Sequence, residues 1–197
     1  MMPEHPRSRP LPTTLPAVFL AALLAGCVTV EKEPDPIVGA KRIFASAQQV
    51  TGNLKGLSGA DSLCGAWAQA AALGGSWKAF LSTSGVNAKD RINDVGPWYN
   101  VNQTTLLFNN KTGFTVGAQS AIRTEYGGSA SGNAWTGTKA NGTADMVNCS
   151  NWTQGGGSAY ASVGSPSITL DDGPGWMAKG GNAPACSTPA RVYCIEQ

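Results

Sequence analysis

Five cysteines constrain what this chain of 197 residues can fold into more than any other feature. Cys27 directly follows an apolar run near the N-terminus, and the other four are Cys64, Cys149, Cys186 and Cys194. An even set of four suits disulfide pairing in an oxidising compartment, and four cysteines permit three pairings, among which their spacing does not choose. The alternatives are four reduced thiols or a zinc cluster, but the spacings contain no paired CxxC, so disulfides are favoured.

The N-terminal segment has the parts of a secretory signal peptide, a basic start followed by a short apolar run over residues 15–25. The run is too short to cross a bilayer core, which needs about 20 residues. Its end, Leu24-Ala25-Gly26-Cys27, resembles the lipobox of bacterial lipoproteins. This resemblance implies a signal peptide over residues 1–26, cleavage before Cys27, and anchoring in a membrane by lipid chains such as palmitate on Cys27. An ordinary cleaved signal and a bare membrane anchor are the alternatives.

Residues 27–40 contain two prolines, mixed charges and no apolar period, which predicts a lipidated cysteine followed by an extended tether. In bacteria that sort lipoproteins by the residue after the cysteine, Val28 favours the outer over the inner membrane. We therefore expect an extracytoplasmic protein of the cell envelope, a monomer, with its folded domain over residues 41–197.

Composition excludes several classes of function. Charged residues make up only 13% of the chain and the formal net charge is +2, which argues against binding to nucleic acid. The single histidine, His5, lies in the predicted signal peptide. The mature chain would then lack Ser-His-Asp or Cys-His catalysis and histidine-ligated zinc.

The 25 glycines and low charge favour a loop-rich domain that contains β-structure. A helix is predicted to open at Ser58, with Asp61 as its capping-box partner, and to end at Gly74-Gly75. Its inward face carries Cys64. Long ordered loops are predicted over residues 127–181. Strands are predicted at residues 42–46, 77–82, 104–108 and 190–195.

Several blocks of residues, in the same order, resemble the endostatin domain of collagens and a related bacterial family of exported lectin-like proteins. They include Leu73-Gly74-Gly75-Ser76-Trp77-Lys78-Ala79-Phe80-Leu81-Ser82, Trp135-Thr136-Gly137, Cys149-Ser150-Asn151-Trp152 and Cys186-Ser187-Thr188-Pro189-Ala190-Arg191-Val192-Tyr193-Cys194. The resemblance implies an α+β fold of the C-type-lectin-like (endostatin-like) kind, with an early helix, a mostly antiparallel twisted sheet and long loops. It also implies two nested disulfides, Cys64–Cys194 outside and Cys149–Cys186 inside.

The ligand sets of these relatives do not carry over residue by residue. The calcium-binding triplets of sugar-binding lectins are missing, and before Cys186 only Asn182 retains a possible ligand atom. Asp171 and Asp172 could form a separate oxygen site, although Asp-Asp-Gly is more often a solvated turn. The arginines are scattered rather than clustered. We expect no metal site and no cofactor.

Among the tryptophans, Trp135 and Trp152 are predicted to be framework. Trp176, in the Gly- and Pro-rich segment after Asp172, is the preferred ligand contact. These considerations predict a non-catalytic recognition module that binds a protein or glycan through the loops of residues 127–181. One alternative is a structural envelope lipoprotein without a soluble ligand. The other is a glycan hydrolase that uses Glu125 with Asp145, or Asp171 with Asp172.

Overall fold

The structure is a computed structural model, and it describes residues 35–197. The predicted signal peptide, Cys27 and the first part of the tether lie outside the described residues. The remaining part of the predicted tether is not free of the domain. The amide of Ile37 donates to the carbonyl of Gln103 (3.3 Å), and the side-chain amide of Gln103 donates to the carbonyl of Ala40 (3.2 Å). The chain is therefore already bound to the domain from Ile37 onward.

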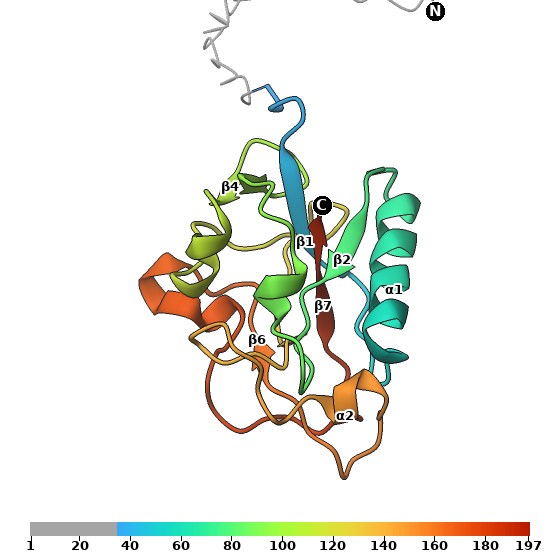
Figure 1. Ribbon diagram of the computed structural model, residues 1–197. Coiled ribbons are helices and arrows are strands. Elements are labelled where there is room, and N and C mark those ends of the chain that lie inside the picture. The colour runs from blue at the N-terminus through green and yellow to red at the C-terminus, as the bar shows by residue number, and fades with distance from the viewer. Residues whose placement is uncertain (1–34) are drawn as a thin grey trace, which may run out of the picture. The chain divides into compact units, whose positions relative to one another are not determined.

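A mixed sheet of seven short strands, with the spatial order β4-β3-β1-β7-β5-β6, forms the centre of the fold (Figure 1). The C-terminal half of β7 pairs with β1 on one side and with β2 on the other. The strands are β1 (Lys41–Ala45), β2 (Trp77–Ala79), β3 (Trp98–Tyr99), β4 (Leu106–Phe108), β5 (Ala134–Trp135), β6 (Val163–Gly164) and β7 (Arg191–Glu196). The four strand regions predicted from the sequence are β1, β2, β4 and β7, while β3, β5 and β6 were not predicted.

The sheet is less uniformly antiparallel than the resemblance implies. The β1–β3 and β5–β7 pairs are parallel, and the other four pairs are antiparallel. The fold class is α+β, as predicted, with a mixed sheet and few helices. Besides α1 (Gly56–Ala70), these are the short α2 (Cys149–Trp152) and three short 3-10 segments, η1 (Ala88–Arg91), η2 (Lys111–Thr115) and η3 (Leu170–Trp176), the last with a kink at Gly173 and Pro174.

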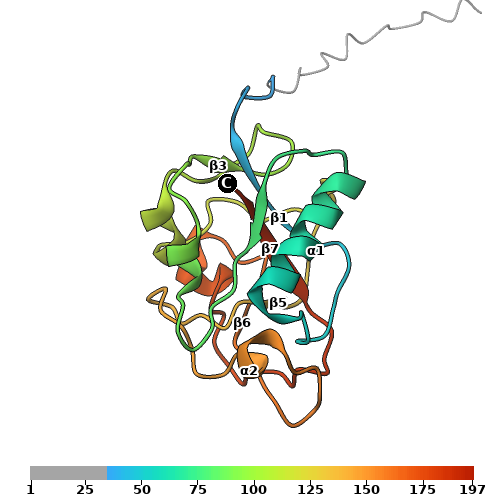
Figure 2. The same ribbon diagram turned by 45° about the vertical axis from the view of Figure 1, so that its right-hand side comes forward.

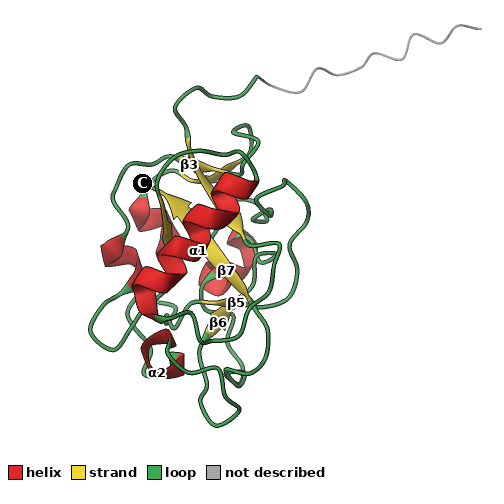
Figure 3. Cartoon of the chain, turned by 90° about the vertical axis from the view of Figure 1, so that its right-hand side faces the viewer, coloured by secondary structure: helices red, strands yellow, loops and turns green. Residues whose placement is uncertain are grey.

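The helix α1 covers one face of the sheet (Figure 3). It begins at Gly56 without a capping side chain, so the capping box expected from Asp61 is wrong. Asp61 instead accepts the amide of Ala79 in β2 (2.8 Å) and pairs with the guanidinium of Arg91 (2.7 Å). Its carboxylate therefore joins the helix to β2 and η1 rather than closing the helix end.

Strand β7 is buried along its whole length, since apolar layers cover both of its faces. Val192 and Cys194 point toward α1, and the outer disulfide Cys64–Cys194, with a Cα–Cα distance of 5.4 Å, fixes the helix to this face. Tyr193 and Ile195 point to the opposite face. This alternation with period two is what a central strand between two layers requires.

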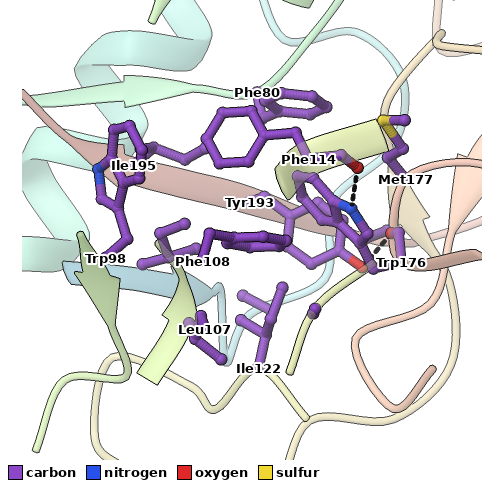
Figure 4. Close-up of a cluster of buried hydrophobic side chains, with 14 of the residues drawn as sticks. Phe80, Trp98, Leu107, Phe108, Phe114, Ile122, Trp176, Met177, Tyr193 and Ile195 are labelled. Atoms are coloured by element: carbon purple, nitrogen blue, oxygen red, sulfur yellow. Dashed lines mark hydrogen bonds between the residues drawn. The ribbon is translucent and has the colours of Figure 1, made fainter. Parts of the chain in front are cut away.

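The second layer is a cluster of buried side chains, which we call the aromatic cluster (Figure 4). Its rings are those of Phe80, Trp98, Phe108, Phe114, Trp176 and Tyr193. Trp176 lies at its centre, with its ring centroid 4.8 Å from Phe80 and 5.3 Å from Tyr193. The hydroxyl of Tyr193 donates to the carbonyl of Trp176 (2.7 Å), and complete burial raises the pKa of Tyr193 well above its ordinary value. The cluster holds η2 and η3 against the sheet.

Candidate functional site

The loops between β5 and β7 are fixed by the inner disulfide, Cys149–Cys186, whose Cα atoms lie 5.8 Å apart. Both nested pairings implied by the resemblance are thus confirmed. The inner bridge packs against the connection between β1 and α1. A Cβ atom added to Gly52 would lie 2.2 Å from the sulfur of Cys149, and the amide of Gly52 donates to the carbonyl of Cys186 (2.8 Å). Position 52 therefore has room only for glycine.

The residues of α2 form an unusual left-handed turn. Cys149, Ser150, Asn151 and Trp152 have φ values of 51°, 54°, 56° and 67°. This region costs residues with a Cβ roughly 1–2 kcal/mol each, so neighbouring contacts must maintain it. The amide of Asn151 donates to the side-chain carbonyl of Asn148 (2.8 Å), and the indole N–H of Trp152 donates to the carbonyl of Ser82 (2.7 Å).

The same turn connects the loops to the segment after β2. The side-chain oxygen of Asn151 accepts the backbone amide of Ser84 (2.8 Å). Trp135 and Trp152 are both fully buried, with ring centroids 6.2 Å apart, which confirms their prediction as framework. The inner disulfide, the left-handed turn of α2 and the two buried tryptophans together fix one end of the loops to the core; we call this attachment the base of the loops.

An open hollow of about 260 Å³ lies above this base, between residues 138–145, 162–163 and 178–183. We call it the loop hollow. Its polar side chains are Thr138, Lys139, Asp145, Ser162 and Asn182. The carboxylate of Asp145 accepts the hydroxyl of Ser162 (2.6 Å), and its backbone amide donates to the carbonyl of Gly137 (2.7 Å). Asp145 is thereby held in place at the hollow, whereas Lys139 and Asn182 are exposed.

The two segments that carry Asp145 and Ser162 run antiparallel to each other. The amide of Ser162 donates to Val147 (3.1 Å), and the amide of Cys149 donates to Tyr160 (3.0 Å). This short ladder also displays two large side chains, Met146 with 82% of its surface exposed and Tyr160 with 49%. The loop hollow and this ladder thus offer a ligand one apolar side chain, one aromatic side chain and several polar groups.

Of the ligand contacts predicted from the sequence, only Asn182 lines the loop hollow. Asp171 and Asp172 are exposed in the first turn of η3, which packs near η2, and they do not join Asn182. Nowhere in residues 35–197 do three or more His, Cys, Asp or Glu side chains gather in a way that could hold a metal ion.

The prediction that Trp176 contacts a ligand is wrong. Its side chain is 0% exposed, and its indole N–H donates to the carbonyl of Phe114 (2.8 Å), as Figure 4 shows. Glycine and proline around it indicated an open loop. Instead, the turn at Gly173 and Pro174 folds the chain back and directs the indole into the aromatic cluster.

Glu125 and Asp145, the first pair of carboxylates considered for a hydrolase, have different places in the structure. Glu125 is 3% exposed and accepts the backbone amide of Ala47 (2.7 Å), so it serves the connection after β1. Asp145 is the one carboxylate among the side chains described as lining the loop hollow. Sequence reasoning missed Lys139 and Ser162 altogether, because no motif distinguishes them from other polar loop residues.

No protein-family model matches the chain, and no curated protein matches its sequence. The endostatin-like assignment therefore stays a prediction.

Proposed function

We propose that this chain is a membrane-tethered, non-catalytic recognition module of the endostatin-like, C-type-lectin-like kind, which binds a glycan or protein outside the cytoplasm at the loop hollow. The observation that carries the proposal is the loop hollow itself. Asp145, Lys139 and Asn182 line it together, on loops that the inner disulfide fixes to the core, and the ladder that carries Asp145 and Ser162 also bears the exposed Met146 and Tyr160. A preformed surface of this kind loses little entropy when it binds.

The position of the loops supports a tethered module. The chain enters the domain at the start of β1, whereas β6 and α2 lie at the opposite end (Figures 1 and 2). A domain attached through lipid on Cys27 would hold its attachment end toward the membrane and its loops away from it. The proposed lipid anchor, and the outer membrane as its location, rest on the lipobox-like residues 24–27.

Two disulfides suggest an extracytoplasmic compartment, since such bonds persist where the surroundings are oxidising. Within the described part of the chain, none of the helices is both long and apolar enough to pass through a bilayer.

A glycan array, followed by pull-down against envelope proteins, tests the proposal with the oxidised full chain purified in detergent. Asp145→Asn removes the carboxylate from the loop hollow, and Asp171→Asn removes the same charge from an exposed site elsewhere. We expect a reproducible ligand whose binding falls at least tenfold in Asp145→Asn and stays unchanged in Asp171→Asn. No ligand in either assay would favour the structural envelope protein instead, and equal binding by both variants would show that the ligand does not bind at the loop hollow.

A further inference from the structure

A second hollow, of about 540 Å³, lies away from the loop hollow, between the turn at residues 100–105 and the segment 119–127. We call it the turn hollow. Its volume falls within the range of sites for small ligands, roughly 300–1,000 Å³. None of the side chains described as lining it is a carboxylate or an aromatic ring, and its polar lining comes from Asn100, Asn102, Thr105, Gln119, Ser120, Arg123 and Thr169.

Hydrogen bonds of two asparagine side chains fix the backbone around the turn hollow. Asn100, which is 2% exposed, accepts the backbone amide of Arg123 (2.8 Å) and donates to the carbonyl of Ala121 (3.0 Å). The side-chain oxygen of Asn102 accepts the amides of Thr104 and Thr105, both at 3.3 Å. The bonds of Asn100 join the two sides of the hollow, and those of Asn102 fix the turn itself, so the shape of the hollow is set before any ligand arrives.

Other polar groups at the turn hollow are left available. The guanidinium of Arg123 donates through Nη1 to the hydroxyl of Ser129 (2.8 Å), and no carboxylate within residues 35–197 forms an ion pair with it. A guanidinium has five N–H donors, so several remain for a ligand. The side-chain amide of Gln119 likewise has no hydrogen bond to another described residue. An unpaired guanidinium in a hollow without carboxylates favours an anionic group.

The composition of the lining restricts which anion fits. A single guanidinium matches one carboxylate in a bidentate arrangement and offers little to a polyanion, which needs clustered cations. The absence of an aromatic ring among the lining side chains removes the usual platform for a sugar ring. Side-chain amides offer both a donor and an acceptor, which complements the N–H and C=O of a peptide backbone.

We propose that the turn hollow binds the C-terminal carboxylate of a peptide. The guanidinium of Arg123 holds the carboxylate, and Gln119 binds the backbone of the preceding residue. Capture of a chain terminus is a recurring mode of peptide recognition, and a guanidinium suits it because it binds a carboxylate through two parallel hydrogen bonds. The site is separate from the loop hollow, so it stands or fails independently of the recognition function proposed there.

NMR titration of the isotope-labelled, oxidised full chain in detergent tests this proposal. The probes are acetyl-tetra-alanine with a free C-terminal carboxylate, the same peptide with a C-terminal carboxamide, and acetate. We expect saturable shifts of the Gln119 side-chain amide and the Arg123 Nε signal with the free acid. Binding of the carboxamide and of acetate should each be at least tenfold weaker, because the first lacks the charge and the second lacks the backbone groups.

Variants separate a specific site from a general charge effect. Arg123→Gln should weaken binding of the free acid to the level of the carboxamide. Lys139→Gln, which removes one positive charge at the loop hollow, should leave binding of the free acid unchanged. Gln119→Ala removes a side chain that forms no hydrogen bond to another described residue. It should therefore weaken binding of the peptide without affecting folding. Equal binding of acid and carboxamide, acetate as strong as the peptide, no binding, or an equal loss in Lys139→Gln would each overturn the proposal.

Discussion

The indole of Trp152 donates a hydrogen bond of 2.7 Å to the carbonyl of Ser82, and this bond joins the left-handed turn of α2 to the segment that follows β2. The turn also carries Cys149, so one short segment connects the loops, the inner disulfide and the sheet. The loops therefore rest on contacts that residues far apart in the sequence provide. The predictions below test how much each of these contacts contributes.

Replacement of Gly52 by alanine should destabilise the protein. The new methyl group would lie 2.2 Å from the sulfur of Cys149, where neither the backbone nor the disulfide can move easily. We expect a loss of about 1–3 kcal/mol in the free energy of unfolding, measured by chemical denaturation of the oxidised chain. Gly65→Ala is the matched control, because α1 has open space there and alanine should stabilise the helix by up to about 1 kcal/mol. Equal effects of the two substitutions would contradict this explanation.

Trp176→Ala should reduce the free energy of unfolding by about 3–5 kcal/mol, since the indole is fully buried in the aromatic cluster. Tyr126→Ala removes an aromatic side chain that is 65% exposed and should change stability by no more than about 0.5 kcal/mol. Denaturant unfolding of both variants measures the difference. An unchanged free energy of unfolding in Trp176→Ala would contradict the central position of the indole in the aromatic cluster.

Removal of the outer disulfide should cost more stability than removal of the inner one. Cys64–Cys194 spans 130 residues of sequence and Cys149–Cys186 spans 37. Loop-closure entropy gives about 5 kcal/mol for the first and about 4 kcal/mol for the second when each is taken alone. Replacing each pair by two alanines, followed by chemical denaturation, gives the comparison. A larger loss for the inner pair would mean that packing around Cys149, and not chain entropy, dominates.

Asp90 should titrate below the usual range of an aspartate. Hydrogen bonds from the side chains of Asn87 (2.7 Å) and Lys89 (3.0 Å) stabilise its charged form and lower its pKa. Because the pKa is lower in the folded state, the stability that Asp90 contributes is present at neutral pH and is lost as the pH falls through the lowered pKa. A carboxyl NMR titration measures this pKa, and Asn87→Ala should raise it more than Lys89→Gln. The reverse order would contradict the assignment of Asn87 as the main cause.

Local patterns predicted the parts of the fold that depend on neighbouring residues. Apolar spacing around Cys64 indicated α1, and the apolar run at residues 190–195 indicated β7. The parallel pairing of β1 with β3 left no such signal, because strand β3 has only two residues and its partner is distant in sequence. Asp61 was misread for a similar reason, since its partners Ala79 and Arg91 are supplied by tertiary structure.

The candidate site was harder to predict than the fold. Asn182 was identified from its position before Cys186, and it lines the loop hollow. Trp176 was misassigned because its surroundings in sequence are those of a loop, although its side chain is at the centre of a core cluster. The contacts of Asp145 with Ser162 and Gly137 arise only when separate loop segments meet.

Amide hydrogen exchange of the oxidised full chain tests most directly whether the loops form an ordered surface. The amides of Cys149, Ser162 and Cys186 all donate to backbone carbonyls within the loop region. We expect these amides to exchange slowly, as we also expect of the buried strand β7, and to exchange faster once Cys149 and Cys186 are replaced by alanine. Exchange in the oxidised chain as fast as that of an unstructured peptide would show that the loops have no fixed form, and would contradict a preformed site at the loop hollow.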